Sequence, residues 1–301
     1  MKKKFILTFT FIFSILLWAC SDPELEKIYP SSITIPDAGT LKYTKTYWDA
    51  PHNKYNKRSG GTSIYDAKLV DNEIWIFASW GNYGQTLFKG INKSASITIQ
   101  YPKKGDSFRY SVESSLMSKG KYIVFCVRND TTYYDDGSKN IYYIARLDRK
   151  TLKREYIRMS DKFDGKDWPN SYNDNENVFI SFKNYYTGSD WVYNYYKIND
   201  DCDDFIEITE KEFNDLYAPN PDYIVDSIGR YYRINKGKLG VSLDNGNTWY
   251  ENDMGTNIPV SIIVQNDSVY VFCSTYSEQN YNLFLGPEIV GGGIHEFKWQ
   301  K

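Results

Sequence analysis

Four segments of the chain share one pattern of polar and hydrophobic positions. Each begins with two or three polar or turn-forming residues and continues with a run dominated by Val, Ile, Phe, Tyr and Trp. The segments are Asp71 to Phe77, Lys119 to Cys126, Asn175 to Phe182 and Asn266 to Cys273, with a weaker fifth copy from Ile228 to Arg233. Short β-branched and aromatic runs after turn signals are typical of β-strands. Successive copies lie roughly 40 to 55 residues apart, a spacing that indicates a repeat architecture.

Each copy is preceded by one candidate strand and followed by two more, and four antiparallel strands per repeat make a blade of a β-propeller. The preceding strands are predicted at Ser63–Leu69, Arg109–Met117, Ser171–Asp174, Tyr223–Asp226 and Val260–Gln265. The last two strands of the fifth blade are predicted at Leu283–Leu285 and His295–Trp299. Ile33–Ile35 and Leu41–Trp48 either begin a sixth blade or pair with the last strand, which would protect an open edge from aggregation. We therefore predict an all-β propeller of five or six four-stranded blades, in a single domain from residue 33 to 301.

One turn in the fourth repeat carries a specific motif, Ser242-Leu243-Asp244-Asn245-Gly246-Asn247-Thr248-Trp249. A carboxylate such as Asp244 accepts hydrogen bonds from turn amides, Gly246 tolerates a positive φ, and Trp249 packs between sheets. The segment resembles the Asp box, Ser-x-Asp-x-Gly-x-Thr-Trp, of bacterial neuraminidase repeat propellers in the sialidase-like superfamily. The resemblance implies a structural turn at the blade periphery and carries no information about activity.

The N-terminus has the layout of an export signal. Lys2, Lys3 and Lys4 precede an apolar segment from Phe5 to Leu17, which is too short for a transmembrane helix of about 20 residues. The following Leu-Trp-Ala-Cys resembles the lipobox of bacterial lipoproteins, in which Cys20 is lipidated and becomes the mature N-terminus. We predict a signal peptide at 1–19 and an acidic tether at 20–32 that resembles those of Bacteroides-group lipoproteins. The protein would then be held in the cell envelope by a lipid anchor, most simply at the outer membrane, on its periplasmic or outer side.

Composition excludes several classes of function. The net charge is −2, so no global positive field attracts nucleic acid. Only two His are present, which argues against a His-rich zinc site and against a Ser-His-Asp triad. Neither acidic run, at Asp135–Gly137 or Asp200–Asp204, has the ligand spacing of a calcium loop. We expect no metal and no cofactor.

Carboxylates on the predicted innermost strands are the candidate catalytic groups. These are Asp66, Glu113 and Asp226, and two carboxyl groups on either side of a sugar suffice for glycoside hydrolysis. Acidic residues also occur on inner strands simply because propeller channels contain water. The three residues are therefore candidates either for catalysis or for solvated positions in the channel.

The sialidase resemblance implies three Arg residues that hold a carboxylate, a Tyr/Glu nucleophile pair and an Asp acid/base. Arg suits this role because its planar guanidinium binds a carboxylate with two parallel hydrogen bonds. The chain lacks the Arg-Ile-Pro motif of that family and offers only Arg58 before its first clear strand. Arg58, Arg230, Arg233 and the loop residue His52 are the candidate ligand-binding residues.

The chain is rich in Tyr, with 28 residues in all, which bears on the kind of ligand it could bind. Tyr rings stack on sugars and add a hydroxyl group, with little side-chain entropy to lose. The main interpretation is an envelope propeller that binds a glycan or a protein partner without catalysis. A sialidase-like or other glycoside hydrolase is the first alternative. A structural lipoprotein that docks envelope proteins is the second.

Overall fold

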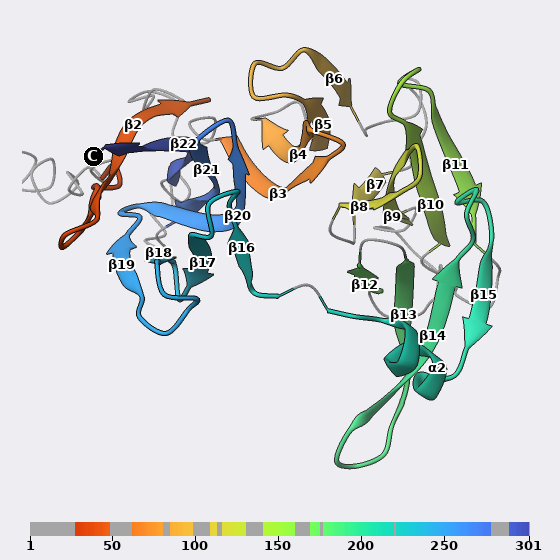
Figure 1. Cartoon of the computed structure of the whole chain (residues 1–301). Helices are drawn as coiled ribbons and strands as arrows, with labels where there is room; N and C mark the ends of the chain where they lie inside the picture. The colour runs from red at the N-terminus through yellow and green to blue at the C-terminus, as the bar shows by residue number, and fades with distance from the viewer. Residues whose placement is uncertain are drawn as a thin grey trace, which may run out of the picture.

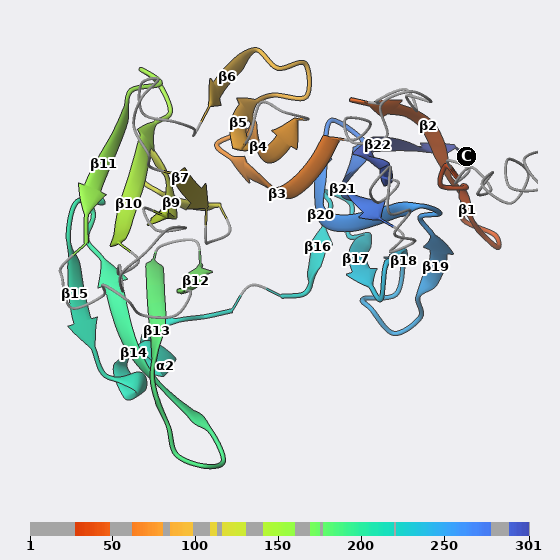
Figure 2. The ribbon, with the colours of Figure 1, turned by 180° about the vertical axis from the view of Figure 1, so that it is seen from behind.

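Five antiparallel sheets make up the part of the chain that the structure describes. This computed structural model describes residues 28–48, 62–80, 85–98, 109–112, 116–130, 141–159, 169–174, 177–219, 221–277 and 289–300. The sheets follow one another along an arc, and the views from the front and from behind agree on their order (Figures 1 and 2). The fold is the predicted all-β propeller, with five blades.

The blades follow the chain in order. Blade 1 contains β3 (Thr62–Val70), β4 (Glu73–Trp80), β5 (Gln85–Lys89) and β6 (Ala95–Thr98). Blade 2 contains β7 (Arg109–Val112), β8 (Met117–Lys119), β9 (Tyr122–Asp130), β10 (Ile141–Asp148) and β11 (Arg154–Arg158). Blade 3 contains β12 (Asn170–Asn173), β13 (Val178–Tyr186), β14 (Trp191–Ile198) and β15 (Phe205–Ile208). Blade 4 contains β16 (Tyr223–Val225), β17 (Tyr231–Asn235), β18 (Lys238–Ser242) and β19 (Tyr250–Asp253).

Blade 5 joins the two ends of the described chain. Its sheet order is β1-β2-β22-β21-β20, with β20 (Asn257–Gln265), β21 (Ser268–Ser277), β22 (Ile289–Gln300), β2 (Gly39–Tyr47) and β1 (Ile33–Ile35). The N-terminal strands therefore pair with the last strand, as one of the two sequence alternatives states. His295–Trp299, predicted as a fourth strand, lies in the third strand of the blade, because β2 takes the outer position. Leu283–Leu285 lies outside the described residues.

Turn chemistry explains why the first two strands of blades 1 and 5 reverse so tightly. Asp71 and Asn72 have φ values of 49° and 61°, and Asn266 and Asp267 have 51° and 61°. Positive φ at both central residues fits a two-residue hairpin whose twist matches that of the flanking strands, and Asn and Asp tolerate this conformation. These polar pairs are the turn-forming residues with which the repeated segments begin in the sequence.

Hydrophobic clusters join four of the five successive blade pairs in the described residues: blades 1 and 2, 2 and 3, 4 and 5, and 5 and 1. Trp75 of blade 1 and Phe125 of blade 2, at 0% and 1% exposure, belong to one of them. Burying a side chain of this size stabilises the fold by about 1.5–3 kcal/mol. The alternating apolar residues of the repeats therefore pack one blade against the next.

A short helix, α2 (Glu210–Leu216), follows blade 3 and is absent from the sequence prediction. Thr209 and Glu212 form a capping box at its N-terminus, in which each side chain accepts a bond from the other residue's backbone N–H. Phe213 packs on Phe179 and Tyr195 of blade 3. The helix thus covers the face of blade 3 opposite the one that packs on blade 2.

The first strands of the blades approach one another and form the inner wall. β20 contacts both β3 and β16, and β8 contacts β12. Side-chain bonds also connect β3 with both neighbouring blades, from Ser261 to the Ala67 carbonyl and from the Leu116 N–H to Asp66. Within the predicted strand Arg109–Met117 the structure describes β7 and the first residue of β8, and these two strands pair with different parts of β9. No helix within the described residues combines the length and apolarity that a bilayer crossing requires.

Candidate functional site

Five polar residues on or next to the first strands of blades 1, 2 and 3 form what we name the inner-strand cluster: Asp66, Lys68, Ser118, Asn173 and Asp174. Asp66 and Lys68 come from β3, Ser118 from β8, and Asn173 from the end of β12. Asp66 follows a register shift between Ile64 and Asp66 in the β3–β4 pairing. Such a bulge redirects side chains and is frequent near functional sites.

Asp66 is an acid with a displaced pKa. Its Oδ1 accepts a bond from the Ala67 N–H at 2.8 Å, and its Oδ2 accepts one from the Leu116 N–H at 2.7 Å. Burial raises the pKa of Asp66 to about 6, against the opposing effects of these two bonds and of the charge on Lys68. A carboxyl group with this pKa exists in both protonation states near neutral pH and suits general acid–base catalysis.

Lys68 links Asp66 to blade 3. Burial lowers the pKa of Lys68, while the charges of Asp66 and Asp174 oppose that change. Its Nζ donates to Oδ1 of Asn173, a residue two blades away along the chain. The cation therefore lies within electrostatic reach of two carboxylates from different blades.

Asn173 fixes the relative positions of blades 2 and 3. Its Oδ1 also accepts the Ser118 N–H at 3.0 Å, and its Nδ2 donates to the carbonyls of Asp174 at 2.6 Å and Asn177 at 2.9 Å. Asp174, only 9% exposed, accepts the Asn177 N–H at 2.6 Å. The cluster is held in place by backbone groups, so its charged side chains have defined positions.

Asp226, the second candidate carboxylate, occupies a different environment. It directly follows β16 and accepts bonds from the N–H groups of Ile228 and Arg230, from Nε of Arg230 at 2.5 Å and from the Tyr232 hydroxyl at 2.9 Å. Burial acts to raise its pKa, but these bonds outweigh burial and the pKa of Asp226 is lowered. None of the contacts described for Asp226 involves the inner-strand cluster. Its surroundings are those of a carboxylate that closes a turn.

The two candidate arginines in the described residues lie apart from that cluster as well. Arg230 pairs with Asp226 and lies over the Trp299 ring at 4.6 Å. Arg233 lies over Trp249 at 4.1 Å and pairs with Glu251 at 2.9 Å. Both side chains thus stack on aromatic rings and pair with acids of blade 4.

The Ser242–Trp249 turn has the hydrogen bonds that its sequence suggests. Ser242 Oγ donates to Asp244 Oδ1 at 2.8 Å and accepts the Gly246 N–H at 2.9 Å, while Asp244 Oδ1 accepts the Thr248 N–H at 2.8 Å. Gly246 has φ 84°. The turn joins β18 to β19 at the outer side of blade 4, far along the sheet from the first strand.

Four candidate residues fall outside the described residues: Cys20, His52, Arg58 and Glu113. Their proposed roles stay predictions. Within the described ranges, no group of three or more His, Cys, Asp or Glu side chains is arranged to hold a metal ion. The three cysteines found there, Cys126, Cys202 and Cys273, are buried.

Asp66 is the only member of the inner-strand cluster among the candidates predicted from the sequence; Lys68, Ser118, Asn173 and Asp174 are not among them. One available signal was the spacing of Asp66 and Lys68, because residues two apart on a strand share a face. Asn173 and Asp174 end the predicted strand Ser171–Asp174, which places them at the inner wall.

Comparisons with known proteins give distant similarities only. No protein-family model matches the chain, and no curated protein matches it. Among solved structures it is similar to Zg3597, a family 117 glycoside hydrolase from Zobellia galactanivorans (TM-score 0.41, 10% identity, covering 91% of this chain and 92% of that one). It is also similar to a family 43 endo-arabinanase from Bacillus licheniformis (TM-score 0.32, 12% identity, 85% and 98% covered). A third is an α-L-arabinanase from Penicillium chrysogenum (TM-score 0.29, 9% identity, 90% and 92% covered). These neighbours are glycoside hydrolases, and at such low TM-scores their activities do not transfer to this chain.

Proposed function

We propose that the protein is a glycoside hydrolase of the cell envelope and that the inner-strand cluster is its catalytic site. The observation that carries the proposal is the convergence of Asp66, Lys68 and Asp174 from blades 1 and 3, at the wall formed by the first strands. In this proposal Asp66 is the general acid and Asp174 is the second carboxylate.

The chemistry follows from the environments of the two carboxyl groups. Glycoside hydrolysis uses one carboxyl group that is protonated and gives its proton to the leaving oxygen, and one that is ionised. The raised pKa of Asp66 keeps a fraction of it protonated near neutral pH. Asp174 lies within electrostatic reach of the positive charge of Lys68, and an opposite charge nearby stabilises the charged form of a carboxyl group. One cluster thus supplies the two unequal acids that the reaction needs.

Export and anchoring are part of the same proposal. Cys20 carries the lipid, residues 20–32 form the tether, and residues 33–301 form one propeller domain at the outer membrane. The turn from Ser242 to Trp249 is an Asp box that stabilises blade 4. Replacing Cys20 by Ala tests the anchor, because the protein should then leave the membrane fraction and appear in the soluble fraction.

A glycan-binding propeller without catalysis is the second candidate, and one observation favours it. The oxygens of Asp66 and Asp174 already accept bonds from Ala67, Leu116 and Asn177. Such engagement is also expected of carboxylates that only hold blades together. The two candidates differ in whether bound glycan is cleaved.

The test is the release of reducing ends from a panel of polysaccharides by the full chain, by three variants of the cluster and by one control variant. Asp66→Asn and Asp174→Asn should abolish release. Lys68→Met should retain some activity with its pH profile shifted to higher pH, because loss of the cation raises the pKa of Asp66. Asp37→Asn changes an exposed acid in the β1–β2 turn and serves as the control. Circular dichroism checks that each variant is folded. Binding without release by the wild type would favour the second candidate, and full activity of folded Asp66→Asn would exclude the proposed acid.

A further inference from the structure

A groove crosses the face of the propeller on which the first and second strands of each blade are joined. It consists of two adjoining hollows that share Glu73 and Lys89. The first lies between blades 5 and 1 and has a volume of about 330 Å³; the second lies between blades 1 and 2 and has about 380 Å³. Each is at the lower end of the range of roughly 300–1,000 Å³ that is typical of small-molecule sites.

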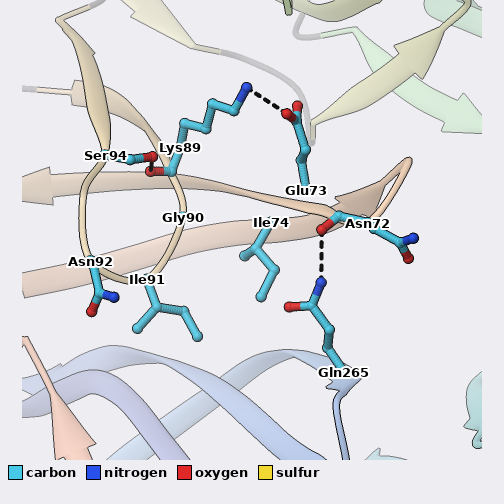
Figure 3. A pocket seen from close by; sticks show the side chains of 9 residues that line it. All are labelled: Asn72, Glu73, Ile74, Lys89, Gly90, Ile91, Asn92, Ser94 and Gln265. Carbon is cyan, nitrogen blue, oxygen red and sulfur yellow. Dashed lines mark hydrogen bonds and ion pairs between the residues drawn. The ribbon is translucent and has the colours of Figure 1, made fainter.

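The first hollow is amphipathic. Figure 3 shows Ile74 and Ile91 beside Asn92 and Gln265, all of which line it. Gln265 Nε2 donates to the Asn72 carbonyl at 2.7 Å, which fixes the amide and leaves its oxygen beside Ile74 (Figure 3). Ile74 is largely buried, at 5% exposure, so Ile91 supplies most of the apolar surface, next to the fixed amide of Gln265 and the amide of Asn92. Apolar side chains next to amides suit a sugar ring, which has apolar C–H faces and a rim of hydroxyl groups.

The second hollow concentrates positive charge. Its lining contains four cations, Lys89, Lys121, Arg149 and Lys150, and two acids, Asp71 and Glu73. The lining residues therefore carry +2, and Asp148, which pairs with Lys121 at 3.6 Å, reduces the local balance to +1, in a chain whose net charge is −2. Arg149 is held by Asp71 at 2.6 Å and by the Gly120 carbonyl at 2.5 Å, whereas Lys121 is 66% exposed. Cations in fixed and exposed positions around one hollow suit an acidic group.

We infer that this groove binds an acidic oligosaccharide, with a sugar ring in the hollow of Ile74 and Gln265 and an acidic substituent beside Lys121, Arg149 and Lys150. The shared chemistry is an anionic oxygen group on a saccharide, either a uronic acid carboxylate or a sulfate ester. The inference rests on the proposal that the protein recognises glycans, but it does not require that the inner-strand cluster cleaves them. Lys89 and Glu73, which pair at 2.6 Å, mark the boundary between the two subsites.

The test uses the full chain in detergent and isothermal titration calorimetry. Oligogalacturonate, sulfated galactan and neutral galactan oligomers of equal length are the probes. At low salt we expect at least one acidic probe to bind about tenfold more tightly than the neutral one, because charge-assisted hydrogen bonds are about twice as strong as neutral ones. The preference should shrink as salt is added, since exposed charges are screened.

Two double variants with the same change in charge locate the site. Lys121→Gln with Lys150→Gln should weaken binding of the acidic probe about tenfold, through the loss of the charge-assisted bonds. Lys236→Gln with Lys238→Gln removes two exposed cations from the β17–β18 turn of blade 4 and should leave binding unchanged. Asp71→Asn should strengthen binding, because it frees Arg149 from its ion pair and because Asn accepts the positive φ of this position.

Vesicles of anionic lipid serve as a further probe. Three results would overturn the inference: equal affinity for acidic and neutral saccharides, equal effects of the two double variants, or binding to the vesicles and to none of the saccharides. The outcome is separable from that of the proposed hydrolase. Acidic glycan that binds in the groove but is never cleaved supports this inference and contradicts hydrolysis. Cleavage that is lost in Asp66→Asn but is unchanged in the groove variants supports the proposed hydrolase and contradicts this inference.

Discussion

Asp66 shows how one buried residue makes the stability of the whole protein depend on pH. Burial raises its pKa from 3.8 to about 6. Between these values the folded state binds more protons than the unfolded state, so stability falls as pH rises. The contribution of Asp66 is fully present below about pH 4 and is lost as pH rises through about 6. A shift of about two pKa units corresponds to about 3 kcal/mol.

The first prediction concerns the pH dependence of unfolding. Asp66→Asn removes this titration, so the wild type should lose about 3 kcal/mol relative to the variant between pH 4 and pH 7. The variant should be the less stable protein at pH 4, by about 1–3 kcal/mol, because an amide leaves either the Ala67 or the Leu116 N–H unpaired. Urea unfolding at several pH values measures both effects, with Asp37→Asn as control. Parallel curves for wild type and Asp66→Asn would contradict the raised pKa.

The strands could be predicted from the sequence, whereas the helix α2 could not. The strands were predictable because each polar turn is followed by a β-branched and aromatic run, as in Asn266 to Cys273. The helix was not, because it has seven residues and only Phe213 is buried in it, too few for a helical period. Its one sequence signal was the capping pair Thr209 and Glu212. Local pattern therefore specified the blades, whereas the helix depends on the tertiary contact of Phe213 with blade 3.

The second prediction tests that contact. Phe213 is 6% exposed and packs against Phe179 and Tyr195, with ring centroids at 5.3 and 4.5 Å. Phe213→Ala should lower the free energy of unfolding by about 3–5 kcal/mol, the usual cost of truncating a buried Phe. Leu216→Ala, in the same helix but at a residue 43% exposed, should change it by less than about 0.5 kcal/mol. Equal effects in urea unfolding would show that the helix is not anchored through Phe213.

At the scale of the whole molecule, the arrangement of the blades determines which distant residues meet, and this could not be predicted from the sequence. Lys68 and Asn173 are 105 positions apart and meet only because the first strands of blades 1 and 3 converge. Ring closure also depends on the arrangement of the blades, because the hydrophobic pattern of the N-terminal strands allowed either the start of a sixth blade or pairing with the last strand. Blade 5 resolves the choice, because β22 has β21 on one side and β2 on the other.

The third prediction follows from this closure. A chain that begins at Ala50 lacks β1 and β2 and exposes the edge of β22, a ready template for pairing with another chain. It also loses Ile33, Ile35 and Leu41, which are 4%, 3% and 0% exposed. At about 1.5–3 kcal/mol for each buried side chain, their loss costs about 5–9 kcal/mol, which is comparable with the whole stability of a typical domain. This chain should aggregate in size-exclusion chromatography and lose its cooperative thermal transition. A chain that begins at Lys27 keeps both strands and the bonds between Ile28 and Thr256, and it should remain monomeric with an unchanged midpoint. If the shorter chain unfolded at the same temperature as the longer one, β1 and β2 would not be needed for the stability of the propeller, and the prediction would be contradicted.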